Sequence, residues 1–174
     1  LYVRSRKEPL YGVSVSERLG YYTLPASEGS VWIHAVSLGE TRAIQTLVVA
    51  IRKARPGVKF VFTHGTATGR EQGLSLLQEG DVQVWQPWDT PQATQRFFAH
   101  FRPRLGVLME TEVWPNLVAQ AAAAGVPLAL VNARLSERSL RGALRWSALA
   151  RPAYARLSLV LAQSQADAQR LRAI

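Results

Sequence analysis

The chain has 174 residues, 48% of them hydrophobic, which is typical of one globular domain with a sizeable core and excludes a disordered chain. It contains no cysteine, which excludes disulfides and thiolate metal sites, and its three histidines have no ligand-like spacing. Lys and Arg outnumber Asp and Glu by 21 to 12. The resulting formal charge of +9 favours an anionic partner, such as nucleic acid, an anionic membrane surface or a phosphorylated substrate.

Residues 1–30 form a basic, tyrosine-rich segment in which prolines and glycines interrupt any helix. No apolar run here or later is long enough to cross a bilayer, and the N-terminus lacks the apolar core of a secretory signal. Because the sequence begins at Leu1 and ends at Ile174 within a helical pattern, we expect it to be an excised piece of a longer protein.

From residue 31 onward, apolar runs of strand length alternate with helical patterns. This alternation predicts an α/β fold, with a Rossmann-like, doubly wound, mainly parallel sheet in a single domain over residues 1–174. The predicted strands are 31–36, 59–63, 82–85, 104–109, 128–131 and 157–162. The first four predicted helices end near residue 55, near residue 77, at residue 101 and before Gly125. A fifth covers residues 136–155 with a break at Pro152, and a last helix begins at residues 163–164.

The loops that follow the strands are polar, and in a parallel sheet they share the edge at which open α/β folds bind ligands. The first loop, from Ser37 to Thr41, places Glu40 in the first turn of a helix, so Glu40 is a candidate catalytic carboxylate. Alternatively, it only complements the positive end of that helix, an effect of about 0.3–1 kcal/mol. The pattern alone does not separate these two interpretations.

Two further loops are candidates for the same crevice. The stretch from His64 to Gly69 resembles a phosphate-cradling turn, but turn statistics favour a Gly/Thr turn that caps a helix, and no nucleotide motif is matched. Glu110 and Glu112 lie two residues apart at the end of an apolar strand. In an extended segment they should face the same way and repel each other unless cations or sugar hydroxyls compensate, so packing alone does not explain them.

A basic run lies toward the C-terminus and is opposed only by Glu137. It is either a solvated helix face or a surface for phosphates or anionic lipid headgroups, and charge patterning does not decide between these. Its members are Arg134, Arg138, Arg141, Arg145, Arg151 and Arg156.

Taken together, these loops resemble the N-terminal half of the 3-deoxy-D-manno-octulosonic acid (Kdo) transferases of Gram-negative lipopolysaccharide synthesis. The matching blocks occur in the family's order and spacing over almost the whole chain, and SLGE and E-x-E-x-W-P-N are the most specific. The blocks are ERLG (17–20), WIHAVSLGE (32–40), T-x-T-G (66–69), PWD (87–89), METEVWPN (109–116), NARLSERS (132–139) and QS (163–164).

The resemblance implies the GT-B fold, in which an N-terminal domain takes the lipid A precursor (lipid IVA) and a C-terminal domain binds the donor, CMP-Kdo. This chain matches only the acceptor domain, so we expect it to be inactive alone. The resemblance also implies the cytoplasmic face of the inner membrane, an N-terminal anchor before ERLG, and chemistry without a metal or cofactor. Lipid A phosphates and the anionic inner leaflet would then explain the basic charge without a nucleic-acid partner.

In this family the glutamate of SLGE is the general base, which corresponds to Glu40. It takes the proton from the 6′-hydroxyl of the acceptor glucosamine while that oxygen attacks the anomeric carbon of Kdo, CMP leaves and the configuration inverts. Partial desolvation should strengthen this base, whereas the helix start should lower its pKa. Glu110 matches the family's second important carboxylate and should orient acceptor hydroxyls or organise the cleft. Weaker candidates for acceptor binding are Ser37, Gly39, Thr66, Thr68, Gly69, Glu112, Asn116, Arg134 and Ser136, and His64 is assigned no role.

Two other classes of function stay open. One is another GT-B or Rossmann-like sugar-nucleotide enzyme, such as an epimerase. The other is a basic nucleic-acid-binding module, which would need basic residues interleaved with exposed aromatic residues on one face. Most tryptophans of this sequence fall in predicted strands or strand-end loops, which argues against the second class.

Overall fold

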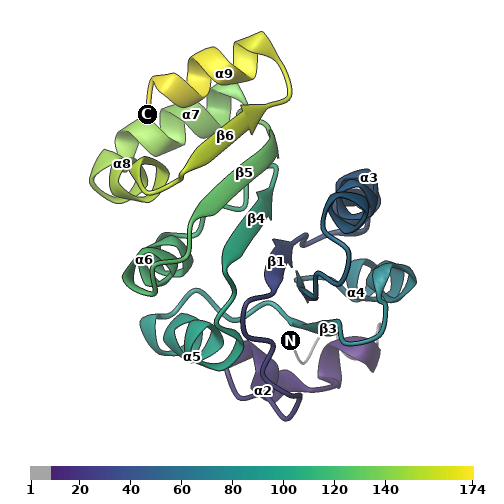
Figure 1. The fold of residues 1–174 in the computed structure, drawn as a ribbon. Helices are drawn as coiled ribbons and strands as arrows, with labels where there is room; N and C mark the ends of the chain where they lie inside the picture. The colour runs from purple at the N-terminus through teal and green to yellow at the C-terminus, as the bar shows by residue number, and fades with distance from the viewer. Residues whose placement is uncertain (1–8) are drawn as a thin grey trace.

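The computed structural model describes residues 9–174, so the first eight residues of the predicted basic segment lie outside the described part. The described residues form a six-stranded sheet, all parallel, in the order β3-β2-β1-β4-β5-β6 (Figure 1). Every strand overlaps a predicted one, which confirms the predicted Rossmann-like fold. The strands are β1 (Val31–His34), β2 (Phe60–His64), β3 (Val82–Trp85), β4 (Leu105–Met109), β5 (Leu128–Ala133) and β6 (Leu159–Ala162).

The order of the strands reverses at β1 and β4, which are neighbours at the centre of the sheet. His34 at the end of β1 lies opposite Leu108 near the end of β4. At such a switch point the loops after the two central strands diverge and leave a crevice in which open α/β sheets bind their ligands. These two loops carry Glu40 and Glu110, so the topology brings together two segments that are far apart in the sequence.

Helices cover both faces of the sheet, as Figure 1 shows, with α3 and α4 on one face and α5 and α6 on the other. The helices are α2 (Val15–Arg18), α3 (Leu38–Ala54), α4 (Ala67–Gly73), α5 (Pro91–Phe101), α6 (Pro115–Ala123), α7 (Glu137–Arg145), α8 (Ser147–Ala155) and α9 (Gln165–Arg172). Two short 3-10 turns, η1 (Pro9–Gly12) and η2 (Leu74–Leu76), complete the described elements.

The alternation of side chains along β1 divides the core into two layers, because a parallel strand covered on both sides is buried on both faces. Trp32 packs with Phe97 of α5 on one face, whereas Ile33 packs with Ile44 of α3 on the other. His34 lies two residues after Trp32 and therefore shares its face. The two rings are 5.5 Å apart between centroids.

The N-terminal segment is fastened to the sheet at β3. The carboxylate of Glu17 in α2 accepts hydrogen bonds from the backbone N–H of Trp85 at 2.7 Å and from Arg70 at 2.8 Å. The Trp85 indole N–H donates to the carbonyl of Val13 at 2.8 Å, and the Arg18 guanidinium lies 4.1 Å from the Trp85 ring centre. The described part of this basic segment is therefore built into the domain.

One predicted boundary is wrong. The sequence predicts a helical break at Pro152, but α7 ends at Arg145, the non-helical backbone lies at Trp146, and Pro152 lies inside α8. A proline removes one backbone donor, and here the helix continues past it to Ala155. Within residues 9–174, no helix is both long enough and apolar enough to cross a membrane.

Candidate active site

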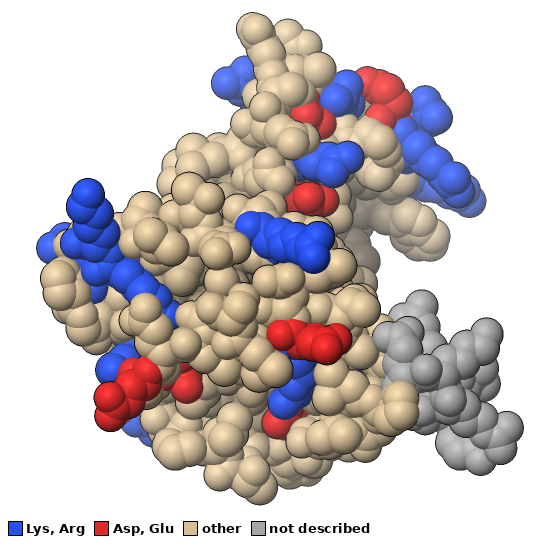
Figure 2. Space-filling view, turned by 90° about the vertical axis from the view of Figure 1, so that its right-hand side faces the viewer, with Lys and Arg blue, Asp and Glu red and all other residues tan. Residues whose placement is uncertain are grey.

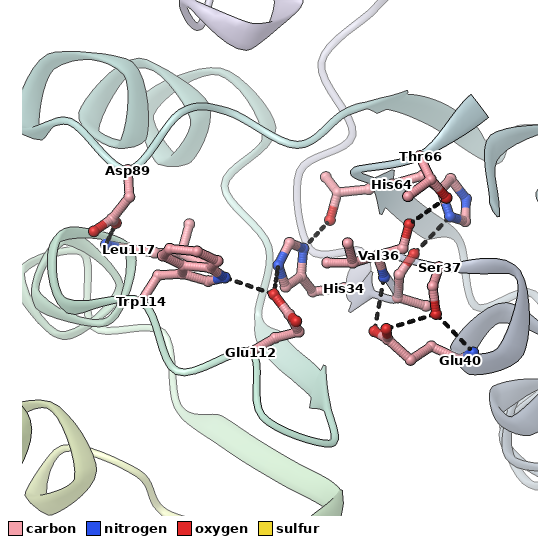
Figure 3. Close-up of polar contacts among 12 residues, drawn as sticks. His34, Val36, Ser37, Glu40, His64, Thr66, Asp89, Glu112, Trp114 and Leu117 are labelled. Atoms are coloured by element: carbon pink, nitrogen blue, oxygen red, sulfur yellow. Dashed lines mark hydrogen bonds and ion pairs between the residues drawn. The ribbon is translucent and has the colours of Figure 1, made fainter. Parts of the chain in front are cut away.

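The candidate site lies where β1 and β4 end, and it is organised by Glu40 (Figure 3). Ser37 is the N-cap of α3, and its hydroxyl accepts from the backbone N–H of Glu40 at 3.3 Å. The same hydroxyl donates to Glu40 Oε1 at 2.7 Å, while the backbone N–H of Val36 donates to Glu40 Oε2 at 2.8 Å. This Ser-x-x-Glu arrangement is a variant of the capping box, and it holds the carboxylate of Glu40, a residue of 7% exposure, beside the end of β1.

Burial raises the pKa of Glu40 above its ordinary value. The hydrogen bonds from Ser37 and Val36 act in the opposite direction, and the negative charge of Glu110 raises the pKa further. The donors at the helix start lower the pKa, as predicted, but desolvation outweighs them and the net shift is upward. The expected partial desolvation of Glu40 is present, and it makes this carboxylate a stronger base than an exposed one.

The two carboxylates after β4 do not face the same way, contrary to the prediction. Glu110 has a φ of 53°, in the left-handed region, and Glu110 and Thr111 form a turn. Glu110 consequently points toward Arg134, with 3.5 Å between the carboxylate and guanidinium. Glu112 turns inward, where its Oε2 accepts from the Trp114 indole N–H at 2.6 Å and lies 3.8 Å from His34 Nε2. The turn thus directs the two carboxylates to different partners.

Glu112 and His34 are both held away from their ordinary charge states. Burial raises the pKa of Glu112 to about 7, with the charges of Glu40 and Glu110 acting in the same direction and the Trp114 hydrogen bond opposing them. Burial also lowers the pKa of His34 to about 3. The close pair of His34 and Glu112 is therefore not an ion pair, because the imidazole is neutral at every pH at which Glu112 is ionised.

Glu112→Gln is expected to stabilise the chain by about 2–3 kcal/mol at about pH 8 and to change its stability little at about pH 4. The folded chain keeps the Glu112 proton up to about pH 7, whereas an unfolded glutamate releases it near its ordinary pKa of 4.5. The stability that this proton contributes is therefore complete below about pH 4.5 and is lost as the pH rises through about 7. Urea unfolding at both pH values measures the difference, with exposed Glu79→Gln as the control.

The loop after β2 is a helix cap. Thr66 is the N-cap of α4: its hydroxyl accepts from the N–H of Gly69 at 3.1 Å and donates to the carbonyl of Val36 at 3.0 Å. Gly69 is buried, and a Cβ there would lie 2.8 Å from the Val36 carbonyl oxygen, so only glycine lets α4 pack this close to the loop after β1. The capping interpretation is therefore confirmed. Both residues pack against Val36, which precedes the loop that carries Glu40.

Asn116 is bound to a loop that the sequence analysis did not connect with it. Its side-chain amide donates to the carbonyl of Asp89 at 2.8 Å, and the Asp89 carboxylate accepts from the backbone N–H of Leu117 at 2.8 Å. The aspartate of the PWD block thus caps α6, which begins within METEVWPN. These two blocks therefore form one hydrogen-bonded structural unit.

The remaining candidates lie in three places. A groove of about 490 Å³ is lined by Glu110, Arg134 and Ser136 together with Gln163 and Arg170, so three predicted residues share one surface. Thr68 lies in another groove between α3 and α4. Gly39 is exposed, and a Cβ there would meet no atom closer than 3.9 Å, so its backbone is open to approach.

The structure gives the unassigned His64 a buried position. Its ring Nδ1 lies 2.7 Å from the carbonyl of Ala35 and 3.3 Å from the Thr41 hydroxyl, and burial lowers its pKa to about 4. His64 is therefore neutral near pH 7, and its ring links the end of β2 to the loop after β1. In residues 9–174 no cluster of three or more His, Cys, Asp or Glu could hold a metal ion.

The arginines of the basic run are all exposed, and α7 buries none of its residues. Trp146, between α7 and α8, is 67% exposed, and Leu149 of α8 is 57% exposed. Figure 2 shows acidic side chains interspersed with basic ones over the face it presents, so the positive charge is not gathered into one continuous patch there. These facts place the run on the surface.

Sequence reasoning missed His34, Trp114 and Asp89 as parts of the site. A histidine in an otherwise apolar strand, immediately before the Glu40 loop, was the available signal for His34. Nothing local indicated that Trp114 would donate to Glu112 or that Asp89 would cap α6, because both depend on how the loops meet.

Comparison with known proteins identifies relatives over most of the chain. Residues 13–174 match the family described as 3-deoxy-D-manno-octulosonic-acid transferase (kdotransferase). A 3-deoxy-D-manno-octulosonic acid transferase of Bordetella pertussis is 52% identical over 146 residues, which cover 81% of this chain and 34% of that protein. The Haemophilus influenzae enzyme of the same name is 33% identical over 169 residues, covering 95% and 39%. The chain thus spans about a third of the length of these curated relatives.

Solved structures with the same fold include a UDP-GlcNAc 2-epimerase from Neisseria meningitidis bound to UDP-GlcNAc. It has a TM-score of 0.57 and 15% identity, over 82% of this chain and 43% of that one. A second UDP-N-acetylglucosamine 2-epimerase has a TM-score of 0.56 and 14% identity, over 84% and 43%. At this level of identity the likeness shows the fold alone.

Proposed function

Because this chain belongs to the family of 3-deoxy-D-manno-octulosonic acid (Kdo) transferases, we propose that it forms the acceptor-binding half of a GT-B enzyme that transfers Kdo to a lipid A precursor. The observation that carries this proposal is the buried carboxylate of Glu40, held by Ser37 and Val36 at the switch point of the sheet. CMP-Kdo would be bound mainly by the further sequence that the relatives possess. The chain alone would then be inactive.

In the proposed reaction, Glu40 acts as the general base. It accepts the proton of an acceptor hydroxyl while that oxygen forms a bond to the anomeric carbon of Kdo, and CMP leaves with the electron pair of the broken bond. Attack opposite the leaving group inverts the anomeric configuration. The raised pKa of Glu40 supports this role, because a base whose pKa lies closer to the working pH accepts a proton more readily.

The groove lined by Glu110 and Arg134 is the proposed place for polar groups of the acceptor. A carboxylate accepts hydrogen bonds from sugar hydroxyls, and a guanidinium binds phosphate oxygens. The exposed arginines of α7 and the tryptophan that follows it are the proposed contact with an anionic membrane surface, at which the acceptor would be met. The full enzyme would accordingly work at the cytoplasmic face of the inner membrane.

Saturable binding of tetraacylated lipid A precursor to this chain is the expected result, measured by calorimetry or tryptophan fluorescence at low and moderate salt. Arg134→Gln should weaken that binding about tenfold, because it removes a charged partner for phosphate. Arg104→Gln is the matched control, since Arg104 is an exposed arginine whose backbone N–H bonds Ser30 at the other end of the strands.

A random DNA duplex serves as the anionic competitor in the same assay. The proposal predicts weak DNA binding that moderate salt abolishes, since only non-specific charge contributes. Tight DNA binding without lipid binding would contradict the acceptor role and favour a nucleic-acid-binding module instead.

A further inference from the structure

A buried histidine lies between the core of the sheet and Glu112. His34 has no exposed surface, and its Nδ1 lies 2.7 Å from the hydroxyl of Thr63 on the neighbouring strand β2. The Thr63 hydroxyl also accepts from the Trp32 indole N–H at 2.8 Å. On the opposite side of the ring, Nε2 has no hydrogen-bond partner and faces the Glu112 carboxylate at 3.8 Å (Figure 3).

The groups on the two sides of the imidazole favour one position for its proton. The Thr63 hydroxyl has one hydrogen, and Trp32 already occupies one of its acceptor positions. The 2.7 Å contact with Nδ1 forms whichever atom donates, so the other side of the ring decides: an unprotonated Nε2 would turn its lone pair toward the Glu112 carboxylate, whereas an Nε2–H group turns a donor toward it. In that arrangement the Thr63 hydroxyl donates to Nδ1. If Nδ1 accepts from Thr63, the single proton of the neutral ring must lie on Nε2, which faces Glu112.

We propose that His34 is a positioning residue for Glu112. As the Nε2–H tautomer, with Nδ1 accepting from Thr63, it directs an N–H group at the Glu112 carboxylate and, together with the Trp114 indole, orients that carboxylate beside Glu40 and Glu110. In this arrangement a chain of contacts from Trp32 through Thr63 to His34 links the sheet core to the largely buried Glu112 side chain. Any effect of this contact on catalysis rests on the proposed function, whereas the placement of His34 against Glu112 does not.

The groups around Glu112 make a neutral donor useful at this place. Glu40 approaches from α3 and Glu110 from the end of β4, and both negative charges oppose ionisation of Glu112. His64, at the end of β2, opposes a positive charge on His34. An N–H dipole stabilises the ionised carboxylate without requiring a buried cation, and it thereby influences how many protons the three carboxylates hold near neutral pH.

Nitrogen-15 NMR of the imidazoles in the whole chain tests the tautomer directly. We expect His34 to carry its proton on Nε2, with Nδ1 unprotonated, and to stay neutral between about pH 5 and about pH 8. A His34 resonance typical of the Nδ1–H tautomer, or of a ring that titrates in this range, would overturn the proposal. This measurement needs no variant, so it is decisive even if a substitution at position 34 prevents folding.

A pair of variants tests the effect on Glu112. The side-chain carbon-13 resonance of Glu112, assigned with Glu112→Gln, should titrate near pH 7 in the unchanged chain. His34→Phe keeps a ring but removes the N–H, and it should raise this midpoint by about one pH unit, whereas His34→Gln, which retains an amide N–H, should restore it. A merely structural histidine predicts the same midpoint in both variants, which would contradict the proposal.

These readings are independent of the proposed function. Lipid binding could fail while the tautomer and the titration behave as expected, in which case the Kdo acceptor role is wrong and His34 still positions Glu112. Conversely, intact lipid binding with an Nδ1–H tautomer would leave the acceptor role in place and overturn only the role of His34.

Discussion

Glu40→Gln in the full-length transferase is expected to lower kcat for Kdo transfer by about 100- to 10,000-fold, with acceptor binding retained. The amide has nearly the size of the carboxylate, and it can still accept from the N–H of Val36 and donate to the hydroxyl of Ser37. It cannot accept the proton of the acceptor hydroxyl. The loss should therefore appear in the chemical step, measured as initial rates at saturating donor and acceptor.

The pH dependence provides a second readout of the same prediction. Because Glu40 must be ionised to act as a base, kcat of the unchanged enzyme should fall as the pH drops through its pKa, which burial raises. The remaining activity of the Gln variant should not follow this dependence. Glu79→Gln, at an exposed position between η2 and β3, is the control and should leave kcat unchanged. If Glu40→Gln retained most of the activity, Glu40 would be a helix cap and not the base.

Glu17→Ala is expected to destabilise the domain by about 3–5 kcal/mol. The carboxylate of Glu17 is buried and accepts from the Arg70 guanidinium and from the backbone N–H of Trp85. Truncation would leave a largely buried cation and a buried donor without partners, and both are costly in a medium of low dielectric constant. Urea unfolding followed by tryptophan fluorescence measures the change.

Glu28→Ala is the matched control for this stability change. Its carboxylate lies 3.7 Å from the Arg102 guanidinium, with side-chain exposures of 74% and 66%, so the pair is solvated on both sides. Its removal should change the free energy of unfolding by less than about 0.5 kcal/mol. Similar losses of unfolding free energy in the two variants would contradict the prediction that burial of Glu17 makes its ion pair stabilising.

Local sequence patterns were sufficient for the strands and for most helix starts. The apolar runs recur with strand length, and Ser37, Thr66 and Ser136 each stand at the N-cap of the helix that their sequence position indicates. Such signals are local, since a cap bonds within three residues and a strand's apolar character is visible in the strand itself. The family blocks likewise identify the relatives without knowledge of any contact.

The orientation of the carboxylates after β4 could not be predicted in this way. The sequence places Glu110 and Glu112 at the end of a strand, but the left-handed backbone at Glu110 sends one toward Arg134 and the other into the interior. The partnership of Asp89 with Asn116 joins segments 27 residues apart, and neither residue indicates it alone. Only the packing of the loops against each other selects these pairs.

The sequence by itself thus determined the parallel α/β fold and the sheet edge with the polar loops, and its resemblance to a family pointed to Glu40 as the candidate base. The tertiary structure decided the charge states: it buries Glu112 between His34 and Trp114, so that its pKa rises to about 7, and it raises that of Glu40 where the helix start alone would lower it. The physical reason is that desolvation and charge interactions depend on which side chains are brought together from distant segments, whereas strand and cap signals depend on neighbours along the chain.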